Sequence, residues 1–221
     1  HAGFDVNSSV YLWWRSVLEF PLINPFWFET VSRNIALSKE DLNRSFPGND
    51  KGTLGERIAD RIFNFILASN PSLVIDLHND WNKSIPYVLN DPSSYSDVDR
   101  FIIEYSKATG LLQIEDTEKI HSSLTYNLNK QNIPAIVLEL GESFIINERN
   151  IIIGINAIWN ILMKLEMVPK TDFYEYPIHP DIRNMPLRYS CLPLSSTSGI
   201  VRFMKKPGDL VTKDQKIARI Y

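Results

Sequence analysis

The sequence predicts an α/β fold: a mixed, mostly parallel sheet flanked by helices, with a small β-rich domain after it. Two short apolar runs, residues 72–77 and 135–140, are typical of strands buried on both faces of such a sheet. An amphipathic helix is predicted at residues 55–68, before the first run, and a long helix at residues 148–165, after the second. After about Met167, prolines and short β-like runs replace this pattern, which indicates a separate unit.

The part of the chain before the first predicted strand holds two predicted helices with a loop between them. Residues 8–20 carry many apolar side chains and no Gly or Pro, and Pro21 would end a helix there. Residues 26–50 are irregular, and polar residues, Pro and Gly fill their later half, so we expect a long ordered loop of the kind that often carries function. In residues 55–68 apolar side chains recur at helical spacing with charges between them, and Pro71 stops the pattern.

Each of the two apolar strands brings a chemically active side chain to its carboxyl end. His78 follows residues 72–77, and Glu139 lies near the end of residues 135–140. Between them we expect a strand at residues 87–89 and a helix at residues 98–109. The helix at 148–165 then closes the α/β layer.

The last part of the chain is predicted to be a proline-rich linker and a small β unit. We expect strands within residues 187–192, 199–204 and 216–221, with a turn entering a strand at residues 206–211. The predicted domains are therefore an α/β domain at residues 1–168 and a linker plus small β-rich domain at residues 169–221.

Composition excludes several classes of protein. A chain of 221 residues with 44% hydrophobic content can form one sizeable core, so disorder is not expected. The net charge of −3 and the lack of a basic tract give no reason to bind nucleic acid or an anionic membrane. Residues 151–163, one of the longest apolar stretches, are too short to span a bilayer, and no signal peptide stands at the start. A single cysteine, Cys191, fits a reducing compartment, so we expect a cytoplasmic protein, with Cys191 as an ordinary buried side chain.

The positions of His78 and Glu139 predict a site, because ligands of open α/β sheets bind beyond the carboxyl ends of the strands. Imidazole is a good zinc ligand, and a nearby carboxylate can take a proton from water as that water attacks a carbonyl. Asp76 lies two residues before His78 and could orient the imidazole from the same face of the strand. Taken singly, each residue also has an ordinary interpretation: a structural histidine, or a solvated glutamate.

Several motifs in a fixed order resemble those of the succinylglutamate desuccinylase/aspartoacylase family, whose members are relatives of the zinc carboxypeptidases. They are Asn24-Pro25, Phe28-Glu29, Arg33, the segment Asp41-Leu42-Asn43-Arg44-Ser45-Phe46-Pro47-Gly48, Glu56-Arg57, Asp76-Leu77-His78, Ile133-Pro134-Ala135 and Glu139-Leu140-Gly141. The tail from Ser198 to Gln215 resembles the small β domain that follows the catalytic domain in many members, whose shape is similar to a biotinyl or lipoyl carrier fold.

The resemblance implies a zinc carboxypeptidase-like fold, one Zn²⁺ per chain, and a role for each matching residue. His78 matches the family's third zinc ligand and Glu139 its general base. Asn43 and Arg44 match the pair that binds the substrate's carboxylate, a task suited to the planar guanidinium. Arg33 matches the arginine that polarises the scissile carbonyl. Without the resemblance, Arg33 and Arg44 would be surface cations and Asn43 a turn residue.

The amino terminus departs from the family pattern. The family supplies its first two zinc ligands from a His-x-x-Glu motif, whereas this sequence begins with His1 and has Asp5 four residues later. Either His1 and Asp5 replace that pair as metal ligands, or the metal site is incomplete.

The implied function is a zinc-dependent amidohydrolase that cleaves an N-acyl amino acid or a similar small substrate with a free carboxylate. Two alternatives stay open: a carboxypeptidase acting on short peptides, and a metal-free binding module that retains the fold. Trp27, Phe28 and Trp81 could line an apolar acyl pocket, although aromatic residues more often belong to the core. Tyr189 could approach the site from the β unit, but nothing in the sequence places it. The sequence does not indicate an oligomeric state.

Overall fold

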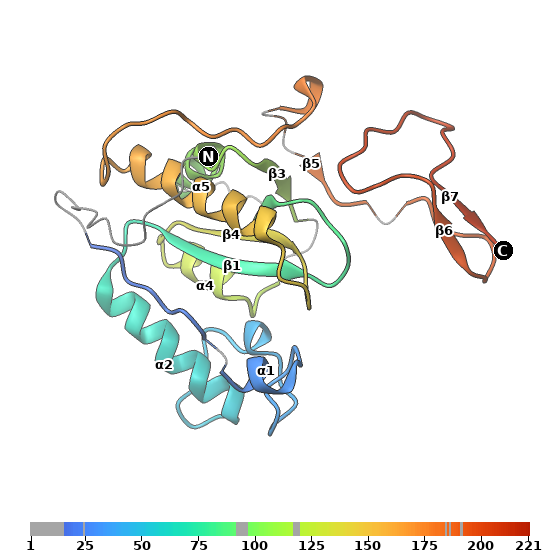
Figure 1. Ribbon diagram of the computed structural model, residues 1–221. Helices are drawn as coiled ribbons and strands as arrows, with labels where there is room; N and C mark the ends of the chain where they lie inside the picture. Colours follow the sequence, from blue (N-terminus) through green and yellow to red (C-terminus); the bar gives the residue numbers. More distant parts are fainter. Residues whose placement is uncertain are drawn as a thin grey trace.

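A five-stranded mixed sheet with helices on both faces forms the body of the protein (Figure 1). The computed structural model describes residues 16–23, 25–91, 97–116, 120–183, 185, 187–190 and 192–221, with the backbone alone for residues 26–28. The strands of the sheet are β1 (Val74–Asp80), β2 (Tyr87–Asn90), β3 (Leu112–Glu115), β4 (Ala135–Glu142) and β5 (Leu187–Arg188). The helices are α1 (Pro25–Thr30), α2 (Leu54–Ser69), α3 (Asp97–Ala108), α4 (Leu124–Lys130) and α5 (Glu148–Lys164), with the 3-10 helices η1 (Leu42–Arg44) and η2 (Pro180–Ile182).

The strand order is β1-β4-β2-β3-β5, and β2 pairs with β4 as the one antiparallel neighbour in this sheet. The predicted mixed, mostly parallel sheet is therefore confirmed. The register of the central strands matters for function. In it, Glu139 of β4 lies opposite His78 of β1 on one side and opposite Tyr87 of β2 on the other.

The two faces of the sheet belong to two different hydrophobic cores. One core joins Ala135 of β4 to buried residues of α2 and α4, and the other joins Ile136 and Leu138 to buried residues of α3 and α5. Figure 1 shows α5 above the sheet and α2 and α4 below it. Because side chains alternate along a strand, Glu139 points to the same face as Ala135, the face that carries α2 and α4.

Helix α2 confirms the predicted amphipathic helix and shows why it begins where it does. Thr53 accepts a hydrogen bond from the Glu56 backbone N–H, and the Glu56 carboxylate accepts one from the Thr53 N–H, which satisfies two free donors of the first turn. At the other end Asn70 adopts a left-handed conformation with φ of 44°. The buried residues Ala59, Phe63 and Ile66 face the sheet.

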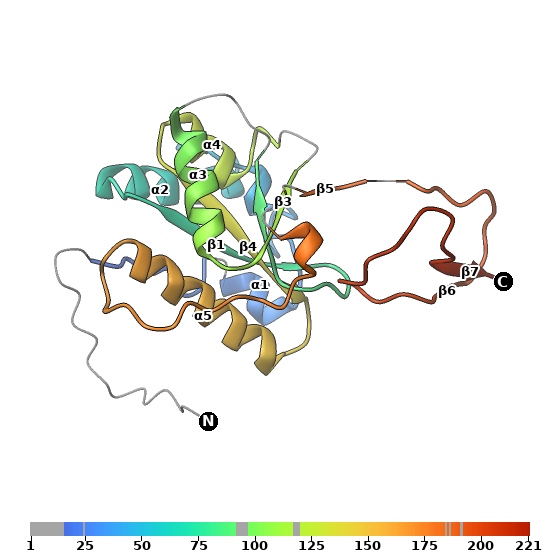
Figure 2. The ribbon, with the colours of Figure 1, turned by 90° about the horizontal axis from the view of Figure 1, so that it is seen from above.

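The carboxyl-terminal strands are divided between two sheets. β5 pairs with β3 at the edge of the main sheet, whereas β6 (Val201–Phe203) and β7 (Ala218–Ile220) form a separate antiparallel hairpin. Figures 1 and 2 both show this hairpin projecting away from the sheet. The strand expected within residues 187–192 thus extends the main sheet and does not join the hairpin. The turn at 206–211 is present, with Asp209 accepting from the Lys206 N–H, but no strand follows it at Leu210.

Two predictions for the amino-terminal part need correction. Residues 16–20 have no regular structure, so this part of the helix predicted at 8–20 is wrong, and the rest of that helix lies outside the described residues. The segment predicted as an unbroken loop contains α1 and η1, which are too short to produce a helical periodicity in the sequence. No helix in the described ranges is long and apolar enough to cross a membrane.

Candidate active site

His78 and Glu139 lie side by side on the face of the sheet that carries α2 and α4. The distance between His78 Nδ1 and Glu139 Oε1 is 3.6 Å, and His78 Nε2 lies 3.0 Å from Asp76 Oδ2. The parallel pairing of β1 with β4 produces this arrangement, because His78 and Glu139 are register partners and partners in a sheet share a face. The structure therefore brings together the three residues expected at these strand ends.

The two carboxylates control the protonation of the imidazole. Burial alone would disfavour the charged form of His78, but the charges and hydrogen bonds of Asp76 and Glu139 outweigh it and raise the pKa of His78 to about 10. Without a metal, the imidazole is thus an imidazolium held between two anions. A metal ion would take the place of this proton, since only the neutral imidazole ligates.

Glu139 has a buried oxygen with no partner. Its side chain is 9% exposed, and Oε2 makes no hydrogen bond to any described residue. Leaving a buried carboxylate oxygen unsatisfied is costly, so such an atom usually has a functional partner such as water or an ion. Oε2 is therefore the atom of this site best suited to accept a proton.

The described residues fit part of a zinc site. His78 offers an imidazole whose Nε2 is held by Asp76, which leaves Nδ1 beside Glu139 for a metal. Within the described ranges, no group of three or more His, Cys, Asp or Glu side chains is placed so that it could hold a metal ion. The other two predicted ligands, His1 and Asp5, lie outside the described residues.

Asp41 organises the predicted carboxylate-binding residues. It caps η1, where its Oδ1 accepts from the Asn43 backbone N–H at 3.0 Å, and its Oδ2 pairs with Arg33 Nε at 2.8 Å. One side chain thus connects Arg33 to the Asn43-Arg44 pair, although Arg33 and Asp41 are eight positions apart in the sequence. The sequence signal for this role is the position of Asp41 two residues before Asn43, which is typical of a cap.

Asn43 and Arg44 differ in how they are held. Asn43 Oδ1 accepts from the Leu124 backbone N–H at 2.9 Å, which ties η1 to the start of α4 and leaves the amide N–H groups as donors for a ligand. Arg44 is exposed, and its Nη1 donates to the Asn43 carbonyl. Across the described residues, no hydrogen bond or ion pair joins Arg33 or Arg44 to His78 or Glu139, so their roles stay predictions.

Tyr87, Asp80 and Tyr189 extend the site beyond the predicted residues. Tyr87 is buried opposite Glu139, and its hydroxyl donates to Asp80 Oδ1 at 3.2 Å and also bonds to the Tyr189 hydroxyl. Burial raises the pKa of Tyr87 well above its usual range and that of Tyr189 to about 12, so both hydroxyls stay protonated at neutral pH. Tyr189 reaches this place because β5, directly before it, joins the main sheet. Sequence reasoning missed Tyr87 and Asp80, since their place depends on strand register.

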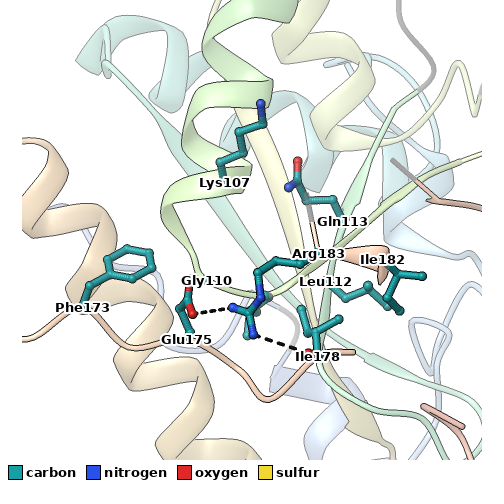
Figure 3. Close-up of a pocket in the computed structure, with 10 residues that line it drawn as sticks. Lys107, Gly110, Leu112, Gln113, Phe173, Glu175, Ile178, Ile182 and Arg183 are labelled. Atoms are coloured by element: carbon teal, nitrogen blue, oxygen red, sulfur yellow. Dashed lines mark hydrogen bonds and ion pairs between the residues drawn. The ribbon is translucent and has the colours of Figure 1, made fainter. Parts of the chain in front are cut away.

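Two cavities lie in the described part of the chain, and one of them borders these residues. A cavity of about 690 Å³ opens next to Asp80 and Tyr87 and is lined by residues of both the sheet and the carboxyl-terminal segment. The other has a volume of about 30 Å³, and Figure 3 shows the Arg183 side chain among the residues that line it. There Arg183 pairs with Glu175 and donates to the Ile178 carbonyl at 3.4 Å. About 30 Å³ is the space of a single water molecule, so only the larger cavity can receive a substrate.

Comparison with known proteins identifies the family. Residues 15–165 match the model of the succinylglutamate desuccinylase/aspartoacylase catalytic domain. The chain belongs to this family. A relative from Halomonas elongata, described as an N-alpha-acetyl-L-2,4-diaminobutyric acid deacetylase, is 28% identical over 213 residues, which cover 93% of the chain and 60% of that relative. The chain therefore spans less than two thirds of the relative's length.

Solved structures support the same fold. The succinylglutamate desuccinylase/aspartoacylase from Rhodobacter sphaeroides aligns with a TM-score of 0.73 at 17% identity, over 90% of this chain and 60% of that one. The product-bound ectoine utilization protein EutE (DoeB) from Ruegeria pomeroyi aligns with a TM-score of 0.72 at 21% identity, over the same shares, 90% and 60%. At these identities the likeness shows the fold, and it agrees with the family-level resemblance seen in the sequence motifs.

Proposed function

We propose that this family member is a zinc-dependent amidohydrolase that cleaves the amide bond of an N-acyl amino acid or a similar small carboxylate substrate. The observation that carries the proposal is the His78–Glu139 pair, with Nδ1 and Oε1 3.6 Å apart at the strand ends, while Glu139 Oε2 has no hydrogen bond within the described part of the chain. Family membership and the deacetylase from Halomonas elongata support the same class of reaction.

In the proposed reaction Glu139 moves the proton. Water adds across the amide C–N bond: Oε2 of Glu139 takes a proton from the attacking water and later returns it to the departing amine nitrogen, which leaves a carboxylic acid and a free amine. Zinc, when bound through His78, would supply Lewis-acid polarisation of the carbonyl and a lower pKa for the water. Asp76 keeps the imidazole in its orientation by holding Nε2.

The loop around η1 would bind and orient the substrate. The exposed guanidinium of Arg44 and the free amide N–H groups of Asn43 suit a carboxylate, because they can donate parallel charge-assisted bonds. Arg33, held by Asp41, would stabilise the charge that develops on the carbonyl oxygen. No position in this scheme requires a nucleic acid or a membrane.

The proposal is tested by metal analysis together with a Glu139→Gln variant. Gln keeps the shape of the side chain but removes the base, so turnover of N-acetyl amino acids should fall by about 10²- to 10⁴-fold while zinc content stays the same. Glu142→Gln, on the same strand but bonded to Asn147, is the matched control and should retain activity. Unaltered turnover in Glu139→Gln would remove Glu139 from the mechanism.

The same experiments separate the alternatives. Faster cleavage of short peptides than of acylated amino acids would reassign the protein as a carboxypeptidase. If isothermal titration detects no zinc binding and no substrate is turned over, the protein is a metal-free binding module. The cytoplasmic location also stays a prediction, since Cys191, on which it rests, lies outside the described residues.

A further inference from the structure

The cavity of about 690 Å³ opens at the end of the sheet where Tyr87 lies opposite Glu139, and several of its lining residues share the face of the catalytic pair. In the sheet register Leu112 pairs with Tyr87, and Ile114 pairs with Leu89 and Leu187. Register partners share a face, so these side chains point to the side on which Tyr87 and Glu139 lie. Three other lining residues, Ile85, Tyr176 and Ile178, belong to the core formed with α3 and α5, so the cavity lies at the end of the sheet and is bordered by residues of both faces.

The walls of this cavity are mainly apolar or aromatic. They include six such residues: Trp81, Ile85, Tyr87, Ile114, Leu187 and Tyr189. Of the charged lining residues, Lys83 and Arg149 are exposed. Asp80 is engaged by the Tyr87 hydroxyl. Asp209, the remaining acidic lining residue, is exposed as well, so the cavity suits an apolar group, with Asp80 as its partly buried charge.

The cavity adjoins the proposed site through Tyr87, whereas the catalytic pair and the residues of η1 do not line it. Tyr87 forms the cavity wall next to Glu139, as its register partner. Leu42 of η1 packs instead into the core that contains Leu124 and Ala135, over β4. A substrate held by Arg44 at one end, with its amide at His78 and Glu139, would extend its acyl group over β2 and β3.

We propose that this cavity is an acyl pocket and that the substrates are N-acyl amino acids whose apolar acyl group is larger than acetyl. This inference rests on the proposed amide hydrolysis. A volume of about 690 Å³ lies within the range of about 300–1,000 Å³ typical of small-molecule sites. An acetyl group would leave most of the apolar wall uncovered, whereas each added methylene removes apolar surface from water.

Tyr189 determines the depth of the pocket. Its ring meets that of Tyr87 edge to face, with centroids 6.3 Å apart, and its hydroxyl bonds to the Tyr87 hydroxyl. It comes from the carboxyl-terminal segment, which also contributes residues 207–210 to the lining of the pocket. Trp81 stands at the mouth, where its ring lies 6.0 Å from that of Phe144, and it is 65% exposed.

A chain-length series on the unaltered protein tests the proposal. One amino acid is acylated with acetyl, butanoyl, hexanoyl and octanoyl groups, and kcat/KM is measured for each. Burial of each methylene should raise kcat/KM by about threefold to fourfold until the pocket is full. A kcat/KM that is highest for acetyl and falls with chain length overturns the acyl pocket while leaving amide hydrolysis intact. Hydrolysis of none of the four compounds contradicts the proposed function itself.

Variants at Tyr189 give a second test. Tyr189→Ala should deepen the pocket and shift the optimum to a longer acyl chain, whereas Tyr189→Phe keeps the ring and should keep the optimum. Tyr189 is 42% exposed, so neither change is expected to prevent folding. Phe203→Ala, at a 76% exposed aromatic residue in β6, is the control and should leave the whole series unchanged. An identical chain-length profile in Tyr189→Ala and the unaltered protein overturns the role of Tyr189.

Discussion

The link from Asp41 to Arg33 leads to a prediction in which activity and stability respond differently. Replacing Asp41 by Asn removes the ion pair with Arg33 Nε, which is 2.8 Å long, but retains an oxygen that can accept from the Asn43 N–H. Asn is as good a helix cap as Asp, so η1 should persist. The variant therefore isolates the effect of releasing the arginine.

The expected loss of stability is small. The two side chains of the pair are 47% and 22% exposed, and exposed ion pairs contribute about 0–1 kcal/mol. In a chain of this size, that corresponds to a shift in Tm of less than about 4 °C. Activity should respond far more, because an arginine that loses its fixed position no longer meets the carbonyl oxygen. Misplacing a catalytic group by about 1 Å costs about 10²-fold, so we expect kcat/KM to fall by about 10- to 100-fold.

The assay is hydrolysis of an N-acetyl amino acid with thermal unfolding measured in parallel. Asp60→Asn is the matched control, since Asp60 on α2 also accepts a single side-chain hydrogen bond, from Asn64 at 2.9 Å. If Asp41 acts through Arg33, the double variant Asp41→Asn/Arg33→Ala is no slower than Arg33→Ala alone. Full activity in Asp41→Asn would refute the reasoning. So would a double variant whose loss of kcat/KM equals the product of the losses in the two single variants.

Three further predictions concern the carboxylate, the metal and the core. Arg44→Lys replaces a forked donor by a point charge, so steady-state kinetics should show KM raised by about 10- to 100-fold with kcat little changed; an unchanged KM contradicts carboxylate binding at Arg44. Zinc must displace a proton from His78, whose pKa is about 10, so zinc affinity measured by titration should rise about tenfold per pH unit from pH 6 to 8; a flat profile would exclude His78 as a ligand. Burial raises the pKa of Asp91 from 3.8 to about 6, so its ionised form weakens the fold as pH rises through that range. The unfolding free energy of Asp91→Asn, relative to the unaltered protein, should accordingly increase by about 1–3 kcal/mol between pH 4 and 8 in denaturant titrations, and an equal difference at both pH values contradicts this.

Long elements with a strong pattern could be predicted from sequence, and short ones could not. α2 and α5 each present an apolar stripe over several turns, and β1 and β4 are apolar runs, so local side-chain spacing specifies them. β5 has two residues, too few to produce a periodicity, and it exists because β3 offers a partner. The helix expected to reach residue 20 does not extend over residues 16–20, where the Phe20 ring packs edge to face against Phe65 of α2, a tertiary contact that needs no helix at Phe20.

The residues of the candidate site also form two groups: those that the sequence singles out and those that only strand pairing brings into the site. The residue types and their order along the chain were enough to single out His78, Glu139 and the Asn43-Arg44 pair, because metal ligation, proton transfer and carboxylate binding each need particular functional groups. Tyr87 and Tyr189 carry no such signal, since an isolated tyrosine is most often a core residue. They join the site because β2 pairs with β4 in one register and β5 pairs with β3 at the sheet edge. Side-chain chemistry is local and can be read along the chain, whereas proximity between residues about one hundred positions apart follows from strand pairing, which only the tertiary structure decides.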